Sequence, residues 1–112
     1  MQTVLPGTLE MLALKAISLG AEHGFGVLQR IQMASGGELQ IEQGALYPAL
    51  HRLEAQGLVS ARWGISENKR KAKYYELTEA GHQRLRSDHQ QWRKLVSAME
   101  AVLNSAMPEV QR

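Results

Sequence analysis

The C-terminal part of the chain carries a long amphipathic pattern that restricts how the whole molecule can fold. Thr78 is a suitable N-cap, and a helical pattern follows it to about Ala106, before Pro108. A seam of mostly apolar residues recurs in it at alternating spacings of four and three, flanked by Leu95 and Val102: Leu85, His89, Trp92, Val96, Met99 and Leu103. A helix of about 28 residues is about 42 Å long, which exceeds the width of a domain built from a chain this short. Part of the seam must therefore pack against a partner, and a homodimer is the most economical interpretation.

A second stretch, from Gln43 to Gly57, predicts a short helix with two contrasting faces. At 100° per residue, Leu46, Leu50 and Leu53 form one narrow apolar stripe. The opposite face carries small, aromatic and polar groups in place of the usual Lys and Glu: Gly44, Tyr47, Pro48, His51 and Ala55, with Arg52 beside them. Such a face is typical of a helix that contacts another molecule. Because of Pro48, we expect this helix either to begin only near Gly44 or to kink at the proline.

Two further helices are expected ahead of this one. Thr8 caps a helix over Leu9 to Leu19, and a second covers about Phe25 to Ala34. The first helix is apolar nearly all round, with Leu9 and Leu12 on one side. Two interpretations stay open: this side is covered by another subunit, or the helix is central in its own domain.

After the Gln43–Gly57 helix, two β-like segments surround a polar loop. Leu58 to Trp63 and Lys73 to Leu77 are rich in branched and aromatic residues, and the loop covers Gly64 to Ala72. Trp63, Tyr74 and Tyr75 are expected to fasten this hairpin to the helices. Five basic residues and one glutamate lie between Arg62 and Lys73, a net charge of +4, whereas the whole chain carries only +2. This concentration indicates a local contact with an anion.

The order of these elements predicts a mainly α fold with a β-hairpin: a winged helix-turn-helix followed by a long dimerisation helix. We expect residues 4–77 to form the DNA-binding domain and residues 78–106 the dimerisation helix. In this fold the third helix enters the major groove and the hairpin lies beside it. Gly44 would then permit close approach to DNA, while Tyr47, His51 and Arg52 offer polar atoms to bases or phosphates. The alternative for Arg52 is an ion pair with Glu54 or Glu42, and Tyr47 in that case lies over the domain surface.

Motifs along the chain resemble the PadR family of bacterial transcriptional regulators. They are Leu5-Pro6-Gly7-Thr8-Leu9, His23-Gly24-Phe25-Gly26, Gly44-Ala45-Leu46-Tyr47-Pro48-Ala49-Leu50, Gly57-Leu58-Val59 and Lys73-Tyr74-Tyr75-Glu76-Leu77-Thr78. The resemblance implies a homodimeric repressor that binds a palindromic operator in double-stranded DNA and is released by a small molecule. Tyr47 matches the tyrosine of the family's recognition helix, and Lys69 to Lys73 match its basic wing. The residues assigned to DNA contact are Gln43, Gly44, Tyr47, His51, Arg52, Lys69, Arg70, Lys71 and Lys73.

The seam of the last helix is also a candidate effector site. Multidrug-sensing members of the resembled family carry a tryptophan in the corresponding helix, which implies that Trp92 and its symmetry mate could sandwich a flat aromatic compound. The alternative, in which Trp92 only packs the dimer, is equally open. The residues assigned to dimer or effector contact are Leu9, Leu12, Leu85, His89, Trp92, Val96, Met99 and Leu103.

Other functional classes find no support in the residues. The chain has no cysteine, one aspartate and four scattered histidines, so no catalytic, cofactor or metal site is expected. No segment has the length and apolar character of a membrane span or signal peptide, and we expect a cytoplasmic protein without a membrane partner. The rival to the regulator is a winged-helix adaptor that contacts another protein without sequence-specific DNA binding.

Overall fold

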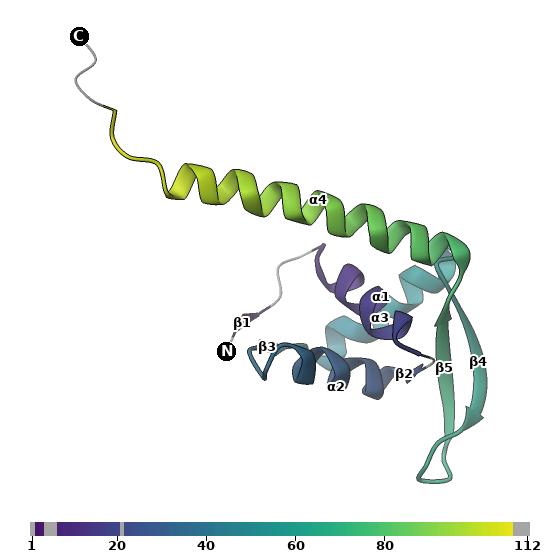
Figure 1. Ribbon diagram of the computed structural model, residues 1–112. Helices are drawn as coiled ribbons and strands as arrows, with labels where there is room; N and C mark the ends of the chain where they lie inside the picture. The colour runs from purple at the N-terminus through teal and green to yellow at the C-terminus, as the bar shows by residue number, and fades with distance from the viewer. Residues whose placement is uncertain (1, 4–6, 21, 109–112) are drawn as a thin grey trace.

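The structure is a computed structural model in which residues 2–3, 7–20 and 22–108 are described. The predicted domain start at residue 4, together with Leu5 and Pro6 of the family motif, lies outside the described residues. Figure 1 shows three short helices gathered beside a β-hairpin, with one long helix crossing above them.

The three short helices lie within two residues of their predicted ends. They are α1 (Leu9–Ser18), α2 (Gly24–Ala34) and α3 (Gln43–Ala55). α3 begins at Gln43 and continues through Pro48. Gly57 follows its C-cap with a φ of +73°, a conformation that a residue with a side chain adopts only at a cost.

The core lies where the three helices and the hairpin meet. The predicted stripe of α3, Leu46, Leu50 and Leu53, is fully buried with Leu14 of α1 and Val27 of α2. Burying each such side chain contributes about 1.5–3 kcal/mol, so this stripe fixes which face of α3 points outward. The exposed face of α3 is therefore set by the packing of its leucines.

Arg30 of α2 holds the C-terminus of α1. Its Nη1 donates hydrogen bonds to the carbonyl oxygens of Ala16 and Gly20 at 2.9 and 2.7 Å, and its Nη2 lies 3.1 Å from Oε2 of Glu22. The Ala16 carbonyl also accepts from the Leu19 N–H, and Gly20 lies just beyond the C-cap of α1, so Arg30 binds the last turn of α1 and the residue that follows the cap. The contact ties α2 to the C-terminal end of α1.

The hairpin is longer than the sequence predicted and carries a third strand. β4 (Val59–Ile65) and β5 (Lys71–Leu77) are antiparallel, and the short β2 (Glu22–His23) pairs with the other edge of β5. The sequence predicted no strand at residues 22–23, which lie between the first two helices and gain their strand geometry from pairing with β5. A separate pair of two-residue strands, β1 (Gln2–Thr3) and β3 (Leu39–Gln40), runs in parallel.

Only one of the three hairpin aromatics has the predicted role of fastening the sheet to the helices. Tyr75 is buried in the core. Tyr74 instead makes an edge contact with the ring of His23, with the ring centroids 5.6 Å apart. Trp63 is 61% exposed, so its predicted packing role was wrong. The hairpin projects past the three short helices (Figure 1).

The long helix α4 (Glu79–Leu103) ends three residues before Ala106, where the sequence placed its end. At about 1.5 Å per residue its 25 residues extend about 37 Å. Its N-terminal part packs on α1, with Leu85 against the core, and its C-terminal part extends past the other helices (Figure 1). None of the helices in the described ranges combines the length and the apolar character that a bilayer span requires.

The first turn of α4 is joined closely to the turn that follows α3. The Thr78 hydroxyl donates to the Gly57 carbonyl oxygen at 2.7 Å and accepts from the Gly81 N–H at 3.0 Å. Gly81 lies directly against the Leu58 carbonyl oxygen, where a Cβ atom would collide with the backbone. We call these four residues, Gly57, Leu58, Thr78 and Gly81, the α3–α4 junction.

Candidate nucleic-acid interface

The outer face of α3 is exposed as predicted. Gln43, Gly44, Tyr47, His51 and Arg52 all lie on the surface, opposite the buried leucines. The face thus presents a phenol, an imidazole and an amide within about three helical turns.

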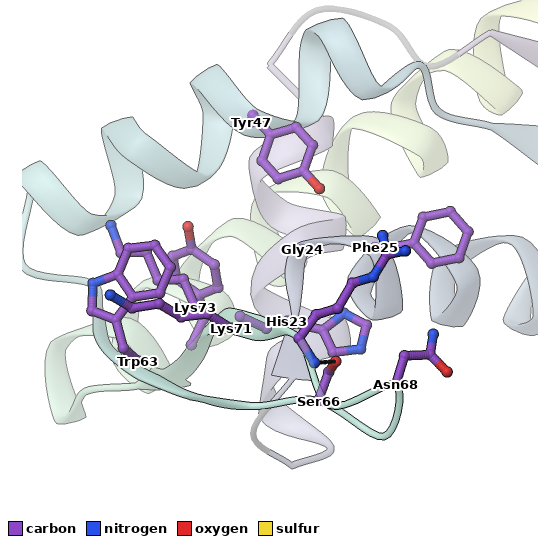
Figure 2. Close-up of a pocket in the computed structure, with 12 residues that line it drawn as sticks. His23, Gly24, Phe25, Tyr47, Trp63, Ser66, Asn68, Lys71 and Lys73 are labelled. Carbon is purple, nitrogen blue, oxygen red and sulfur yellow. Dashed lines mark hydrogen bonds between the residues drawn. The ribbon is translucent and has the colours of Figure 1, made fainter.

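Tyr47 is held in place by a glycine of another helix. The ring of Tyr47 lies so close to Gly24, at the start of α2, that a Cβ atom there would be 2.6 Å from its Cε1 atom. Tyr47 remains 48% exposed, and Figure 2 shows its hydroxyl pointing toward the start of α2. The absence of a side chain at residue 24 therefore determines where the phenol lies.

The start of α2 is itself fixed by hydrogen bonds. His23 is the N-cap, and its Nδ1 accepts a hydrogen bond from the Gly26 N–H at 3.0 Å. The His23 N–H donates to Oε1 of Glu22, also at 3.0 Å. These contacts hold Gly24 beneath the Tyr47 ring.

Arg52 is ion-paired, but with neither of the predicted partners. Its Nε lies 2.7 Å from Oε1 of Glu10 on α1, and its side chain remains half exposed. The expectation of Glu54 or Glu42 considered only neighbours in sequence, whereas the packing of α1 on α3 brings in a residue 42 positions away.

Lys73 differs from the other basic residues of the hairpin because it connects β5 to α3. Its Nζ donates a hydrogen bond to Oε1 of Glu54 at 2.7 Å and lies 5.7 Å from the centre of the Tyr75 ring. The bond to Glu54 raises the pKa of Lys73, and burial raises the pKa of the Tyr75 hydroxyl. Lys69, Arg70 and Lys71 are exposed at and beside the tip of the hairpin. Lys69 has a φ of +57° in the tight turn there.

A groove of about 590 Å³ separates α3 and the start of α2 from the hairpin. Tyr47 lies on one side of it, and the hairpin residues lie opposite (Figure 2). The side chains that line it are aromatic, basic or neutral: His23, Phe25, Tyr47, Trp63, Ser66, Asn68, Arg70, Lys71, Ala72, Lys73 and Tyr75, together with Gly24. None of these described lining residues is acidic. Sequence reasoning did not assign Gly24, Phe25 or Trp63 to a contact surface, although the His-Gly-Phe-Gly motif was a signal for the first two.

A second cleft, of about 400 Å³, lies between α1 and α4. Four of the predicted dimer or effector residues line it: Leu12, Leu85, His89 and Trp92. Met11, Lys15 and Arg86 complete the lining. Leu9 packs against the core, while Val96, Met99 and Leu103 lie farther along α4 and are exposed. The predicted set therefore divides into a cleft within one subunit and an uncovered apolar seam.

Known proteins resemble this chain in sequence and in fold. Residues 13–87 match the family described as transcriptional regulator PadR-like. An uncharacterized protein of Lysinibacillus sphaericus is 27% identical over 89 residues, which cover 80% of this chain and 82% of that protein.

Solved structures of transcriptional regulators also resemble this chain. A PadR family transcriptional regulator from Eggerthella lenta is 33% identical with a TM-score of 0.75, over 89% of this chain and 85% of that one. A PadR family regulator from Clostridium difficile R20291 is 25% identical with a TM-score of 0.74, over 88% of this chain and 100% of that one. A transcriptional regulator from Clostridium thermocellum, 22% identical with a TM-score of 0.76 over 84% of this chain and 91% of that one, shares the fold.

Proposed function

The chain belongs to the PadR-like family of transcriptional regulators, and on this basis we propose that it is a homodimeric repressor of transcription that binds a palindromic operator. One observation carries the proposal. The exposed face of α3 and the basic tip of the hairpin border the same groove, and no acidic side chain is among the described residues that line it. A surface of this kind attracts the phosphate backbone while a helix contacts base edges in the major groove.

The two parts of this surface have different tasks. Gln43, Gly44, Tyr47 and His51 approach the base edges in the major groove. Lys69, Arg70 and Lys71 pair with phosphates. Arg52 and Lys73 lie at the border of the interface and contribute less, because Glu10 and Glu54 already compensate their charges.

The exposed seam of α4 supplies the second half of the proposal. Val96, Met99 and Leu103 are uncovered in the single chain, and Leu103 is 72% exposed. A two-fold partner would cover these side chains and place two copies of α3 in successive major grooves, about 34 Å apart. Residues 4–77 would then contact DNA, and residues 78–106 would form the dimer.

A small aromatic effector would act at the cleft between α1 and α4. Trp92 and Met11 offer apolar surface there, and Lys15, Arg86 and His89 suit a polar or acidic group on the same molecule. Binding would favour a dimer whose spacing no longer fits the operator. In a Trp63→Phe background Trp92 is the one remaining tryptophan, so its fluorescence should change on titration with flat aromatic compounds. An unchanged signal would leave Trp92 with dimer packing alone.

Selection from a random pool of duplex DNA tests the main proposal. The wild-type protein should enrich one palindromic sequence and, bound across a promoter, should lower transcription in vitro. Tyr47→Ala should weaken binding to that sequence about tenfold or more, the effect of removing a base-specific interaction, and weaken binding to scrambled duplex much less. If no sequence is enriched, the protein is better described as a winged-helix adaptor for another protein.

A further inference from the structure

The hairpin exposes two large apolar side chains that the fold does not use. Trp63 is 61% and Ile65 is 69% exposed, although both continue the β4 face that is buried at Val59. Side chains alternate along a strand, so Val59, Ala61, Trp63 and Ile65 share one face. Val59 packs in the core, whereas Trp63 and Ile65, nearer the hairpin tip, are exposed. A large apolar side chain left exposed forgoes the free energy of its burial, which indicates a role other than packing.

The same face carries two basic residues of the hairpin, Lys71 and Lys73. Trp63 is opposite Lys73 and Ile65 is opposite Lys71 in the antiparallel register. The Nζ atom of Lys71 lies 5.0 Å from the centre of the Trp63 ring. Figure 2 shows Trp63, Lys71 and Lys73 gathered across the groove from Tyr47. An indole therefore projects into the groove with two ammonium groups beside it.

The chemistry of the groove fits one occupant better than others. Arg70 and Lys71 favour an anion, while Phe25 and Trp63 offer flat apolar surface. A sugar–phosphate strand combines both characters, since its phosphates are charged and its deoxyriboses are largely apolar. An acidic protein segment would satisfy the cations alone.

We propose that Trp63 is a specificity-determining residue that reads the width of the minor groove next to each half-site. The inference rests on the proposed DNA binding, in which α3 occupies the major groove and the hairpin tip pairs with phosphates, and it adds that the tip enters the adjacent minor groove. There the indole lies against the deoxyriboses that form the groove wall, and Arg70 and Lys71 pair with the flanking phosphates.

An indole cannot distinguish base pairs by hydrogen bonding in this position. It carries one N–H donor, and the minor-groove pattern is nearly the same for A·T and T·A. Contact with the sugars instead depends on the spacing of the two groove walls, which is smallest in A-tracts. Trp63 therefore contributes a preference for A·T-rich flanks at positions that α3 does not touch.

Binding to the selected operator with altered flanks tests this role. Two duplexes keep the enriched central sequence and carry either A-tracts or G·C pairs where the hairpin reaches. The wild-type protein should prefer the A-tract duplex roughly tenfold, an effect comparable to one unfavourable base pair. Trp63→Ala should reduce this preference to less than about twofold, and Trp63→Phe should keep part of it because the ring stays flat and apolar.

Two further readouts separate this role from a general loss of binding. Trp63→Ala removes no charge, so the dependence of log K on log salt should keep its wild-type slope. Arg62→Ala is the matched control, because Arg62 lies on the opposite face of the same hairpin and contacts the Tyr74 ring. This control should keep the full flank preference.

The outcomes are distinct. If the wild-type protein enriches no sequence, the proposed function fails. If it enriches an operator but shows no flank preference, or Trp63→Ala keeps the wild-type preference, the role of Trp63 is overturned. The role of Trp63 would also be overturned if Trp63→Ala weakened binding to the A-tract and G·C duplexes equally while its melting temperature stayed at the wild-type value.

Discussion

The contact between Gly24 and Tyr47 determines the position of the proposed base-reading phenol. In sequence these residues are 23 positions apart, and only the packing of α2 against α3 brings them together. The sequence predicted that Tyr47 faces outward, since helical periodicity fixes which side the leucines bury. It could not predict the glycine beneath the ring, because that contact depends on how two helices cross.

Gly24→Ala tests this contact. The added Cβ would meet the Tyr47 ring at 2.6 Å, so the ring must move away from its place above α2. We expect specific operator affinity to fall roughly tenfold, as for one mismatched base pair, with a small change in melting temperature. Tyr47→Ala is the control background, in which Gly24→Ala should have no further effect on binding. A further loss there would mean that Gly24 acts on DNA binding by another route.

Lys73 and Tyr75 predict a decline in stability at alkaline pH. Glu54 raises the pKa of Lys73 and burial raises the pKa of Tyr75 in the folded chain, above unfolded values of about 10.4 and about 10. A group whose pKa is raised on folding stabilises the protein below its unfolded pKa and loses this contribution as pH rises through the folded pKa.

The melting temperature should therefore be insensitive to these two groups between about pH 7 and pH 9 and fall above about pH 10. Circular dichroism melts of Tyr75→Phe should show a smaller fall than wild type over that range, since this variant lacks the ionisable hydroxyl. A fall as steep as in wild type would exclude Tyr75 as a cause.

At the scale of elements, the hairpin shows what a sequence pattern can and cannot supply. Its existence and its basic tip followed from residue types and the charge between Arg62 and Lys73. Its strands extend two residues further into the loop than predicted, because Gly64, Ile65, Lys71 and Ala72 join the hydrogen-bonded ladder despite weak strand signals. β2 has only two residues, so no periodic pattern could identify it.

The hairpin tip should control the salt dependence of DNA binding. Replacing Arg70 and Lys71 with Gln removes two cations per subunit from the groove. The slope of log K against log salt should become shallower by about 0.9 for each phosphate that is no longer neutralised, for both operator and scrambled duplex. Arg93→Gln with Lys94→Gln removes the same charge from α4, away from the groove, and should leave the slope nearly unchanged. If both double variants changed the salt slope equally, the effect would come from the overall charge of the protein and not from the hairpin tip.

At the scale of the whole molecule, the apolar seam of α4 remains uncovered in one chain. The sequence predicted this long helix and its surplus of apolar surface from the spacing of the seam residues. It did not predict that Leu12, Leu85 and Trp92 meet at or beside a cleft within a single subunit, since this depends on how α4 lies across α1. The two-fold partner itself stays a prediction.

Val96→Glu combined with Met99→Glu tests the dimer. Burying two carboxylates in an apolar seam is costly, so the variant should have the mass of one chain, 12.5 kDa, where the wild type has about twice that. Light scattering after size-exclusion chromatography gives the mass. Operator affinity should fall by about 10² or more, because the half-sites are no longer bound together. Ser97→Glu, on the opposite side of α4, is the control. A monomeric wild type would refute the dimer.

The α3–α4 junction links the angle between the two α4 helices of the proposed dimer to the distance between its two α3 helices along DNA. Little freedom remains between α4 and the end of α3, because the Thr78 hydroxyl bonds the Gly57 carbonyl and Gly81 lies against Leu58. In the proposed dimer each α4 therefore behaves as a lever arm about 37 Å long. A tilt of roughly 5° between two such arms moves α3 by about 3 Å, close to the 3.4 Å rise of one base pair. The operator spacing that the dimer prefers therefore depends on the angle between its two α4 helices. Substitutions in the seam should change this preferred spacing in steps of one base pair without altering any residue that contacts DNA.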